Sequence, residues 1–223
     1  PEMRDCPHAE KPDDEKTTEI QSASLDSLQV SDYTGASLDS DDDFDAEFFV
    51  MDLEEIHFDY VDNLCFSEDV VEKAFEAIKN GACIVTDTNM AKAGINKAEL
   101  KKHGGEVFCF MSDDDVRDIA KKNGSTRARA SMDKAASLDK PLIFAIGNAP
   151  TALIRLYELI QEGKLNPELI IGVPVGFVNV VQSKELIMQC DVPYIVARGR
   201  KGGSNVAAAI SNALLYILRD QNK

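Results

Sequence analysis

Three apolar runs of this sequence end in loops that contain glycine, and a helical pattern follows each loop. A helix that begins there leaves backbone N–H groups unpaired, and glycine lets the backbone approach a ligand closely. Together with the loop after ACIVT (82–86), these loops supply Asn89, Met90, Gly147, Asn148, Gly172, Gly176, Arg198 and Gly203. Any one glycine could serve only a tight turn or a helix cap. Their recurrence after successive apolar runs favours a binding site.

The elements that would position these loops alternate in type along the chain. Short apolar runs predict buried strands, and the segments between them have helical periodicity. The five predicted strands are residues 82–86, 106–110, 142–146, 168–173 and 194–198, and the best-marked helices are residues 67–81, 113–122 and 125–138. This alternation predicts an α/β fold with a single doubly wound, mainly parallel five-stranded sheet and helices on both faces. Right-handed crossovers place the five carboxyl ends at one edge, where such folds bind ligands.

Acidic residues are concentrated at the beginning of the sequence. Of 24 Lys and Arg and 39 Asp and Glu residues, residues 1–60 hold 3 and 19, so residues 61–223 hold 21 and 20. The early segment is also rich in Ser and Thr and has little apolar periodicity, as in weakly ordered chains. We therefore predict an acidic, low-order leader over residues 1–47 and one α/β domain over residues 48–223.

Charge, cysteine usage and hydropathy restrict the class of protein. The charge-balanced domain has no basic stripe, so we expect no nucleic-acid partner. Five cysteines are scattered without a C-x-x-C pair, which suits a reducing cytosol. No apolar span approaches about 18 residues and no basic-then-apolar start is present, so we expect neither membrane insertion nor secretion. A cytoplasmic protein is predicted.

Common cofactor and metal motifs of α/β proteins are missing from the sequence. The loop after residues 82–86 has no glycine before Gly94, so it lacks the G-x-G-x-x-G dinucleotide fingerprint. Neither a P-loop nor a G-x-S-x-G nucleophile elbow occurs, and His8, His57 and His103 do not form a zinc cluster. An enzyme without cofactor or metal, or a binding domain, is the remaining expectation.

Several long strings resemble precorrin-8X methylmutase, also called precorrin isomerase. They are IVTDTNMAKAGI (84–95), STRA (125–128), AIGNAPTAL (145–153), GVPVGFVNVVQSKELI (172–187) and ARGRKGGSNVAAAISNALL (197–215). Residues 58–82 further resemble the branch that handles the cobalt-containing intermediate. The resemblance implies an isomerase of cobalamin biosynthesis that moves a methyl group from C11 to C12 of precorrin-8 or cobalt-precorrin-8, giving hydrogenobyrinate or cobyrinate. It also implies a homodimer that needs no added cofactor, with the substrate at the sheet edge and subunit interface.

The resemblance assigns roles to individual residues. Arg127 in STRA matches a family arginine near substrate carboxylates, which its planar fork can bind bidentately; a surface arginine is the alternative. Lys184 would pair with a propionate or lie on a solvated helix face. Arg198, with Arg200 and Lys201, forms a positive cluster that suits several carboxylates or is a basic turn. The other substrate-binding candidates are Ser24, Asn89, Met90, Asn148, Gly176, Phe177 and Gly203.

The catalytic histidine of the family lies in a segment of the form I-H-T-T-x-D-F-D-Y, from which this sequence departs. The corresponding residues are EEIHFDYVDN (54–63), without the two threonines and the following acid. If the gap follows His57, this residue is the proton donor in a shortened loop. If the segment aligns without a gap, Leu53 occupies the catalytic position and activity is impaired. His57 is favoured because it is the only histidine nearby, and a structural histidine is the alternative.

Two functions of other classes stay open at this point. A tetrapyrrole-binding or carrier protein descended from the enzyme would bind corrinoids tightly without turnover. A domain whose acidic leader binds a basic partner would keep its other properties when the leader is deleted. The cobalt content of the substrate is also open, since the metal would arrive inside the macrocycle and needs no protein ligand.

Overall fold

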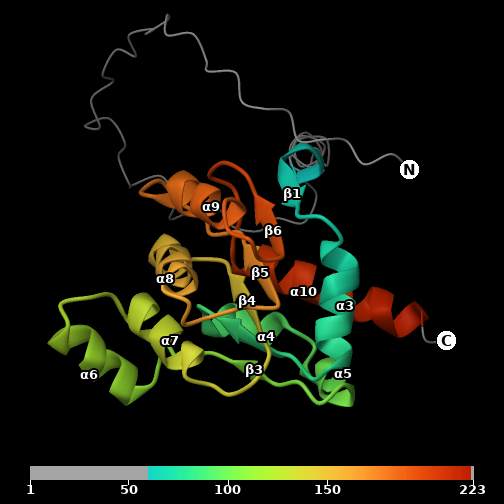
Figure 1. Cartoon of the computed structure of the whole chain (residues 1–223), viewed down its shortest axis with the longest axis horizontal. Helices are drawn as coiled ribbons and strands as arrows, with labels where there is room; N and C mark the ends of the chain where they lie inside the picture. Colours follow the sequence, from blue (N-terminus) through green and yellow to red (C-terminus); the bar gives the residue numbers. More distant parts are fainter. Residues whose placement is uncertain (1–59, 222–223) are drawn as a thin grey trace, which may run out of the picture. The chain divides into compact units, whose positions relative to one another are not determined.

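The computed structural model describes residues 60–221, and its central element is one six-stranded sheet (Figure 1). The strands are β1 (Leu64–Phe66), β2 (Cys83–Thr86), β3 (Val107–Phe108), β4 (Leu142–Ile146), β5 (Leu169–Gly172) and β6 (Tyr194–Ala197). They lie in the order β1-β6-β5-β4-β2-β3. Strands β2 to β6 pair in parallel, whereas β1 is antiparallel to β6.

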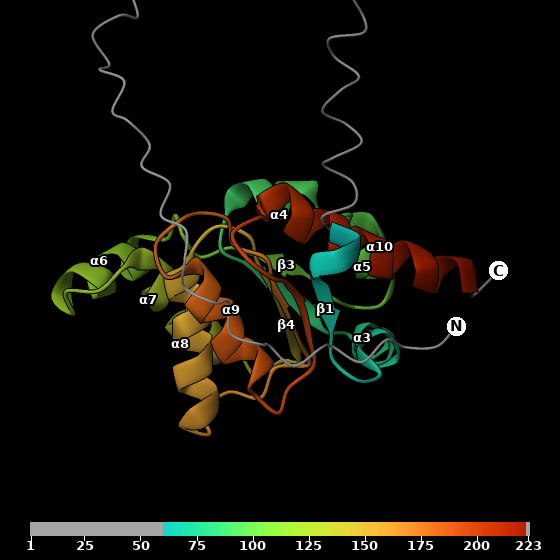
Figure 2. The ribbon, with the colours of Figure 1, turned by 90° about the horizontal axis from the view of Figure 1, so that it is seen from above.

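Helices cover both faces of the sheet, as the view from above shows (Figure 2). One face is covered by α3 (Val70–Lys79), α4 (Asn89–Gly94), α5 (Lys97–Lys102) and α10 (Ser204–Gln221). The other is covered by α7 (Arg127–Ala136), α8 (Pro150–Gln161) and α9 (Val180–Met188), and α6 (Asp114–Lys122) packs on α7. The predicted doubly wound α/β fold is confirmed.

The central strands are apolar throughout because both of their faces are buried. In β4, Ile143 and Ala145 join the hydrophobic cluster of α3 and α10, whereas Leu142, Phe144 and Ile146 join the cluster of α7, α8 and α9. Successive side chains of a strand point to opposite faces of the sheet. Each strand therefore contributes to two cores, which explains a continuous apolar run instead of an alternating one.

All five predicted strands are present, and the sixth strand, β1, was missed. It has only three residues, and its pairing with the edge of β6 is a long-range contact that no local pattern announces. Ser67, a typical N-cap residue at the start of the predicted helix 67–81, extends this ladder instead of capping α3. Its N–H donates to the Tyr194 carbonyl at 3.0 Å, and its Oγ accepts from the Tyr194 N–H at 2.9 Å.

Candidate functional site at the carboxyl edge of the sheet

The parallel strands β2, β4, β5 and β6 end at one side of the sheet, here called the carboxyl edge. The loops at this edge carry Asn148, Gly176, Phe177, Arg198 and Gly203. Asn89 and Met90, which were expected in a loop, form the first turn of α4 at the same edge. Arg127 joins them from α7, because the hydroxyl of the preceding Thr126 donates to Thr151 Oγ1 at 3.2 Å, at the start of α8. The structure thus brings most of the predicted substrate-binding residues to the same edge.

Asp87 is a buried carboxylate that joins the end of β2 to the loop after β4. Its side chain is 1% exposed. Its Oδ1 accepts the N–H of Gly147 at 3.0 Å, and its Oδ2 accepts those of Asn148 at 2.8 Å and Ala149 at 2.6 Å. Burial raises the pKa of Asp87 above its usual range, and the three backbone donors oppose this rise. Since α8 has no side-chain cap of its own, Asp87 supplies an acceptor just before its first turn.

Side-chain hydrogen bonds also connect the loop after β2 with more distant parts of the chain. Thr88 caps α4, and its Oγ1 donates to Ser204 Oγ at 2.8 Å, at the start of α10. Asn89 Nδ2 donates to Ser112 Oγ at 2.9 Å. The start of α10 also lies against the β4 loop, because a Cβ on Gly147 would be 2.6 Å from Ser204 Cα. These contacts fix the loops at the carboxyl edge relative to one another.

Residues 198–203, here called the basic loop, connect β6 to α10 and lie directly on the loop after β5. The N–H of Gly203 donates to the Val173 carbonyl at 2.8 Å. A Cβ at Gly202 would lie 2.1 Å from the same carbonyl oxygen. Only glycine at position 202 therefore allows the two backbones to approach this closely.

Gly202→Ala is expected to lower the free energy of unfolding by about 2–4 kcal/mol, since forced contacts and backbone strain each cost about 1–3 kcal/mol. Gly163→Ala is the matched control, because Gly163 also has a positive φ of 66° but a Cβ at this position would meet no atom within 4 Å. It should cost about 1–2 kcal/mol from backbone conformation alone. Urea denaturation measures both values, and equal losses would contradict the close approach at Gly202.

Lys184 lies on α9, and the structure corrects the expectation of a solvated helix face, whereas pairing with a propionate stays a prediction. The residue is 1% exposed, so it is not on a solvated helix face. Its Nζ donates to the carbonyl oxygens of Gly199 at 2.8 Å and Lys201 at 2.9 Å, so its partners are backbone groups of the basic loop. Burial lowers the pKa of Lys184 to about 8.

Large apolar side chains and cations are exposed at the carboxyl edge. Met90 is 65% exposed and Phe177 is 83% exposed. The guanidinium of Arg200 lies 5.7 Å from the centroid of the Phe177 ring, a cation–π contact between the loops after β5 and β6. Arg198 and Lys201 line a cavity of about 180 Å³ beside them. This combination suits a ligand with a flat apolar body and acidic substituents.

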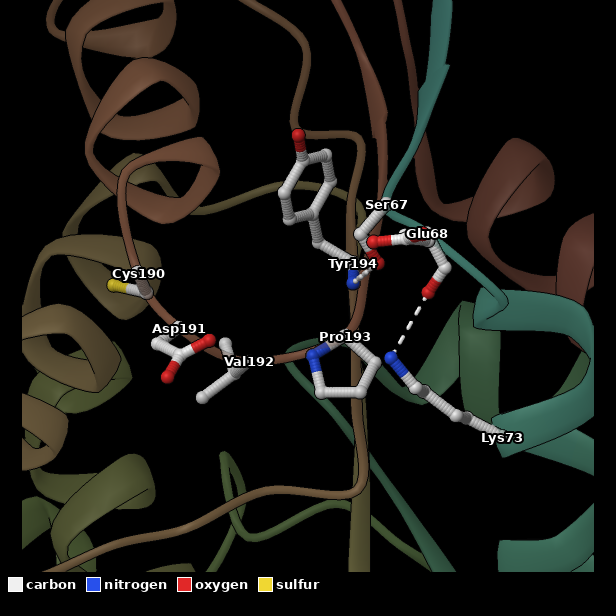
Figure 3. Close-up of a pocket in the computed structure, with 8 residues that line it drawn as sticks. All are labelled: Ser67, Glu68, Lys73, Cys190, Asp191, Val192, Pro193 and Tyr194. Atoms are coloured by element: carbon white, nitrogen blue, oxygen red, sulfur yellow. Dashed lines mark hydrogen bonds between the residues drawn. The ribbon is translucent and has the colours of Figure 1, made fainter. Parts of the chain in front are cut away.

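A second cavity, of about 330 Å³, lies at the start of β6, away from the carboxyl edge (Figure 3). Its lining residues are Ser67, Glu68, Lys73, Cys190, Asp191, Val192, Pro193 and Tyr194. In the close-up, Lys73 Nζ donates to the Glu68 carbonyl at 3.0 Å, and Ser67 accepts from the backbone of Tyr194. Since the lining of this cavity includes no predicted site residue, the carboxyl edge is the better candidate.

Some predictions fall on residues that lie outside the described range of 60–221. These are Ser24, His57 and the boundary between residues 47 and 48. Conversely, the hydrogen bonds that Asp87 accepts from the loop after β4 were not predicted. The available signal was an acidic residue directly after a strand of mainly apolar residues, because a carboxylate buried in that position requires hydrogen-bond donors from a neighbouring loop.

Residues 60–221 contain neither a membrane-spanning helix nor a metal-binding cluster. In this part of the chain no helix is both long and apolar enough to cross a membrane. No three His, Cys, Asp or Glu side chains come together there as a metal-binding group.

The sequence profile of the precorrin-8X methylmutase family matches residues 55–217. The chain belongs to this family. The matched range includes all six strands, the loops of the carboxyl edge and His57. The protein is therefore a methylmutase, an isomerase of corrin biosynthesis, and the resemblance carried by its long sequence strings is confirmed.

Individual relatives include methylmutases named for both forms of the substrate. The cobalt-precorrin-8 methylmutase of Salmonella typhimurium is 48% identical over 164 residues, which are 73% of this chain and 76% of that protein. The precorrin-8X methylmutase of Pseudomonas aeruginosa is 38% identical over 158 residues, which are 70% of this chain and 76% of that protein. The crystal structure of the precorrin-8X methylmutase from Thermus thermophilus matches with a TM-score of 0.67 at 37% identity, over 75% of this chain and 82% of that one.

Proposed function

We propose that this methylmutase moves a methyl group from C11 to C12 of precorrin-8 or cobalt-precorrin-8 and so forms hydrogenobyrinate or cobyrinate. Family membership carries the proposal. Relatives named for the cobalt-containing substrate reach 48% identity, compared with 38% for the Pseudomonas aeruginosa protein, which is named precorrin-8X methylmutase. We therefore favour the cobalt-containing substrate.

The carboxyl edge supports binding of such a substrate through its chemistry. Exposed Met90 and Phe177 offer apolar surface to the face of a macrocycle. Arg127, Arg198 and Arg200 are exposed cations that can pair with peripheral carboxylates. Asn89, Asn148, Gly176 and Gly203 would complete the surface with amide groups and closely approaching backbone. Ser24 stays a predicted substrate-binding residue.

The reaction requires positioning and proton donation more than a redox group. The methyl group leaves one ring carbon and arrives at another within the same molecule, so no atom or electron is gained or lost overall. Holding the ring in one geometry lowers the entropic cost of the migration. His57 donates a proton that polarises the ring and promotes the shift.

The direct test is conversion of purified substrate. The full chain is incubated with cobalt-precorrin-8 and, separately, with the cobalt-free form, and the visible spectrum is followed to that of the corrinoid product. Conversion of either form supports the proposal, and the faster reaction identifies the preferred substrate. If neither form of the substrate is converted, the proposal is contradicted.

Arg127→Ala is expected to weaken binding of the carboxylated product by about 10–100-fold, the size of one lost charge-assisted hydrogen bond in a protected site. Arg127 is exposed at the first position of α7 and forms no ion pair with another described residue. Arg117→Ala on α6 is the control, because the ion pairs of that arginine with described residues are those to the neighbouring Asp114 and Asp118. Titration of the product by absorbance measures both. Equal affinities for the two variants would remove Arg127 from the site.

A corrinoid-binding or carrier protein is the second candidate function. The observation that favours it is the shortened segment around His57, from which the two threonines of the family pattern are missing. Tight binding of the product without any conversion of the substrate would identify a carrier.

We also propose that the protein is a homodimer with an acidic leader over residues 1–47. Val175 and Val178 expose apolar surface that a second copy would cover.

A further inference from the structure

The basic loop exposes three cations, and its backbone conformation determines where they point. Arg198, Arg200 and Lys201 are exposed, and they lie between β6 and α10. Gly199 has a φ of 72°, a conformation that L residues seldom adopt without support. A loop of this kind needs contacts that hold one conformation, because its own residues bury little apolar surface.

Carbonyl groups of the basic loop accept hydrogen bonds from Lys184 and from the loop after β5. The Arg200 carbonyl accepts the N–H of Gly176 at 3.4 Å. The carbonyls on either side of it, those of Gly199 and Lys201, both accept from the ammonium group of Lys184. Three consecutive carbonyls therefore have hydrogen-bond donors, and two of them share the buried ammonium group of Lys184.

We propose that Lys184 is a positioning residue whose ammonium group holds the basic loop in the conformation that presents Arg198, Arg200 and Lys201 to substrate carboxylates. The identity of the ligand rests on the proposed function, but the hold on the loop does not. Lys184 is 1% exposed, so it acts from beneath the loop through two backbone contacts.

Lysine is well suited to this role for chemical reasons. A charged donor forms stronger hydrogen bonds to carbonyl groups than a neutral one, and its three N–H groups can serve two carbonyls at once. No carboxylate within residues 60–221 forms an ion pair with Lys184, so the two carbonyl groups are its partners there. Replacement by an apolar residue would leave these carbonyls without a donor, which favours a different loop conformation.

The test compares the full-length wild type with Lys184→Met, which keeps an apolar stem and removes the donors. Trypsin cleavage after residues 198, 200 and 201, followed by mass spectrometry, is expected to become about tenfold faster in the absence of ligand. The dissociation constant of the corrinoid product is expected to rise about tenfold or more. Lys121→Met is the matched control, because Lys121 is exposed on α6, and both quantities should stay at the wild-type value.

Other outcomes overturn the proposal. Unchanged cleavage in folded Lys184→Met would show that the lysine does not hold the loop, even if product binding weakened. Faster cleavage with an unchanged dissociation constant would show that Lys184 holds the loop but that this conformation does not contribute to product binding. If Lys184→Met does not fold, Lys184→Gln decides by the same two measurements, with smaller increases expected because one amide NH2 remains. If the wild type binds no corrinoid, the proposed function fails, and the cleavage experiment still tests the hold on the loop.

Discussion

His57→Ala is expected to lower the rate of methyl migration by about 10²–10⁴-fold, the usual contribution of a general acid or base. Binding of the corrinoid product should change little, since affinity would come mainly from apolar contacts and from cations at the carboxyl edge. Single-turnover conversion of substrate and titration of product separate these two effects.

The matched control for this substitution is His103→Ala. His103 follows α5 and precedes β3, so it lies away from the carboxyl ends of the strands. Its variant should convert substrate at the wild-type rate. Full turnover by His57→Ala would remove His57 from the mechanism.

Asp87→Ala is expected to lower the free energy of unfolding by about 3–5 kcal/mol. The substitution removes the acceptor of three backbone N–H groups, and a hydrogen bond to a charged group contributes about 1.5–3 kcal/mol. Because two of the three donors approach the same oxygen, Asp87→Asn can keep two bonds and should cost less, about 1–3 kcal/mol. Urea denaturation of both variants measures the difference.

Asp139→Ala controls for the loss of an acidic residue. Asp139 is exposed in the loop before β4, and its removal should change stability by less than about 0.5 kcal/mol. Asp87→Ala should also reduce product affinity, because the loop that carries Asn148 loses its brace. A stability loss no larger than that of Asp139→Ala would contradict the role given to Asp87.

The fold was largely predictable because its signals are local. Strands such as β4 are continuous apolar runs, and the segments that follow them have Pro or Thr near the first turn of a helix, as at Pro150 after β4 and Thr88 after β2. Strand β1 was not predictable in this way. Its three residues are ordered by pairing with β6, which is distant in sequence.

The burial of charged residues and their hydrogen-bond partners could not be predicted from the sequence. Lys184 was expected either at a propionate or on a solvated face, because a lysine on a helix usually keeps its ammonium group in water. The actual partners are carbonyls 15 and 17 residues later in the sequence. Asp87 is similar, since its donors lie 60 to 62 residues away.

The sequence by itself determined the family, five of the six strands with most of the helices between them, and the residues that lie at the carboxyl edge. These depend on short-range periodicity and on strings of residues that can be read without coordinates. Only the tertiary structure decided how the loops are held together, through Asp87 beneath the β4 loop and Lys184 beneath the basic loop. The physical reason is that hydrogen bonds to buried charges join segments far apart in the chain, and their partners are backbone groups that carry no sequence signature.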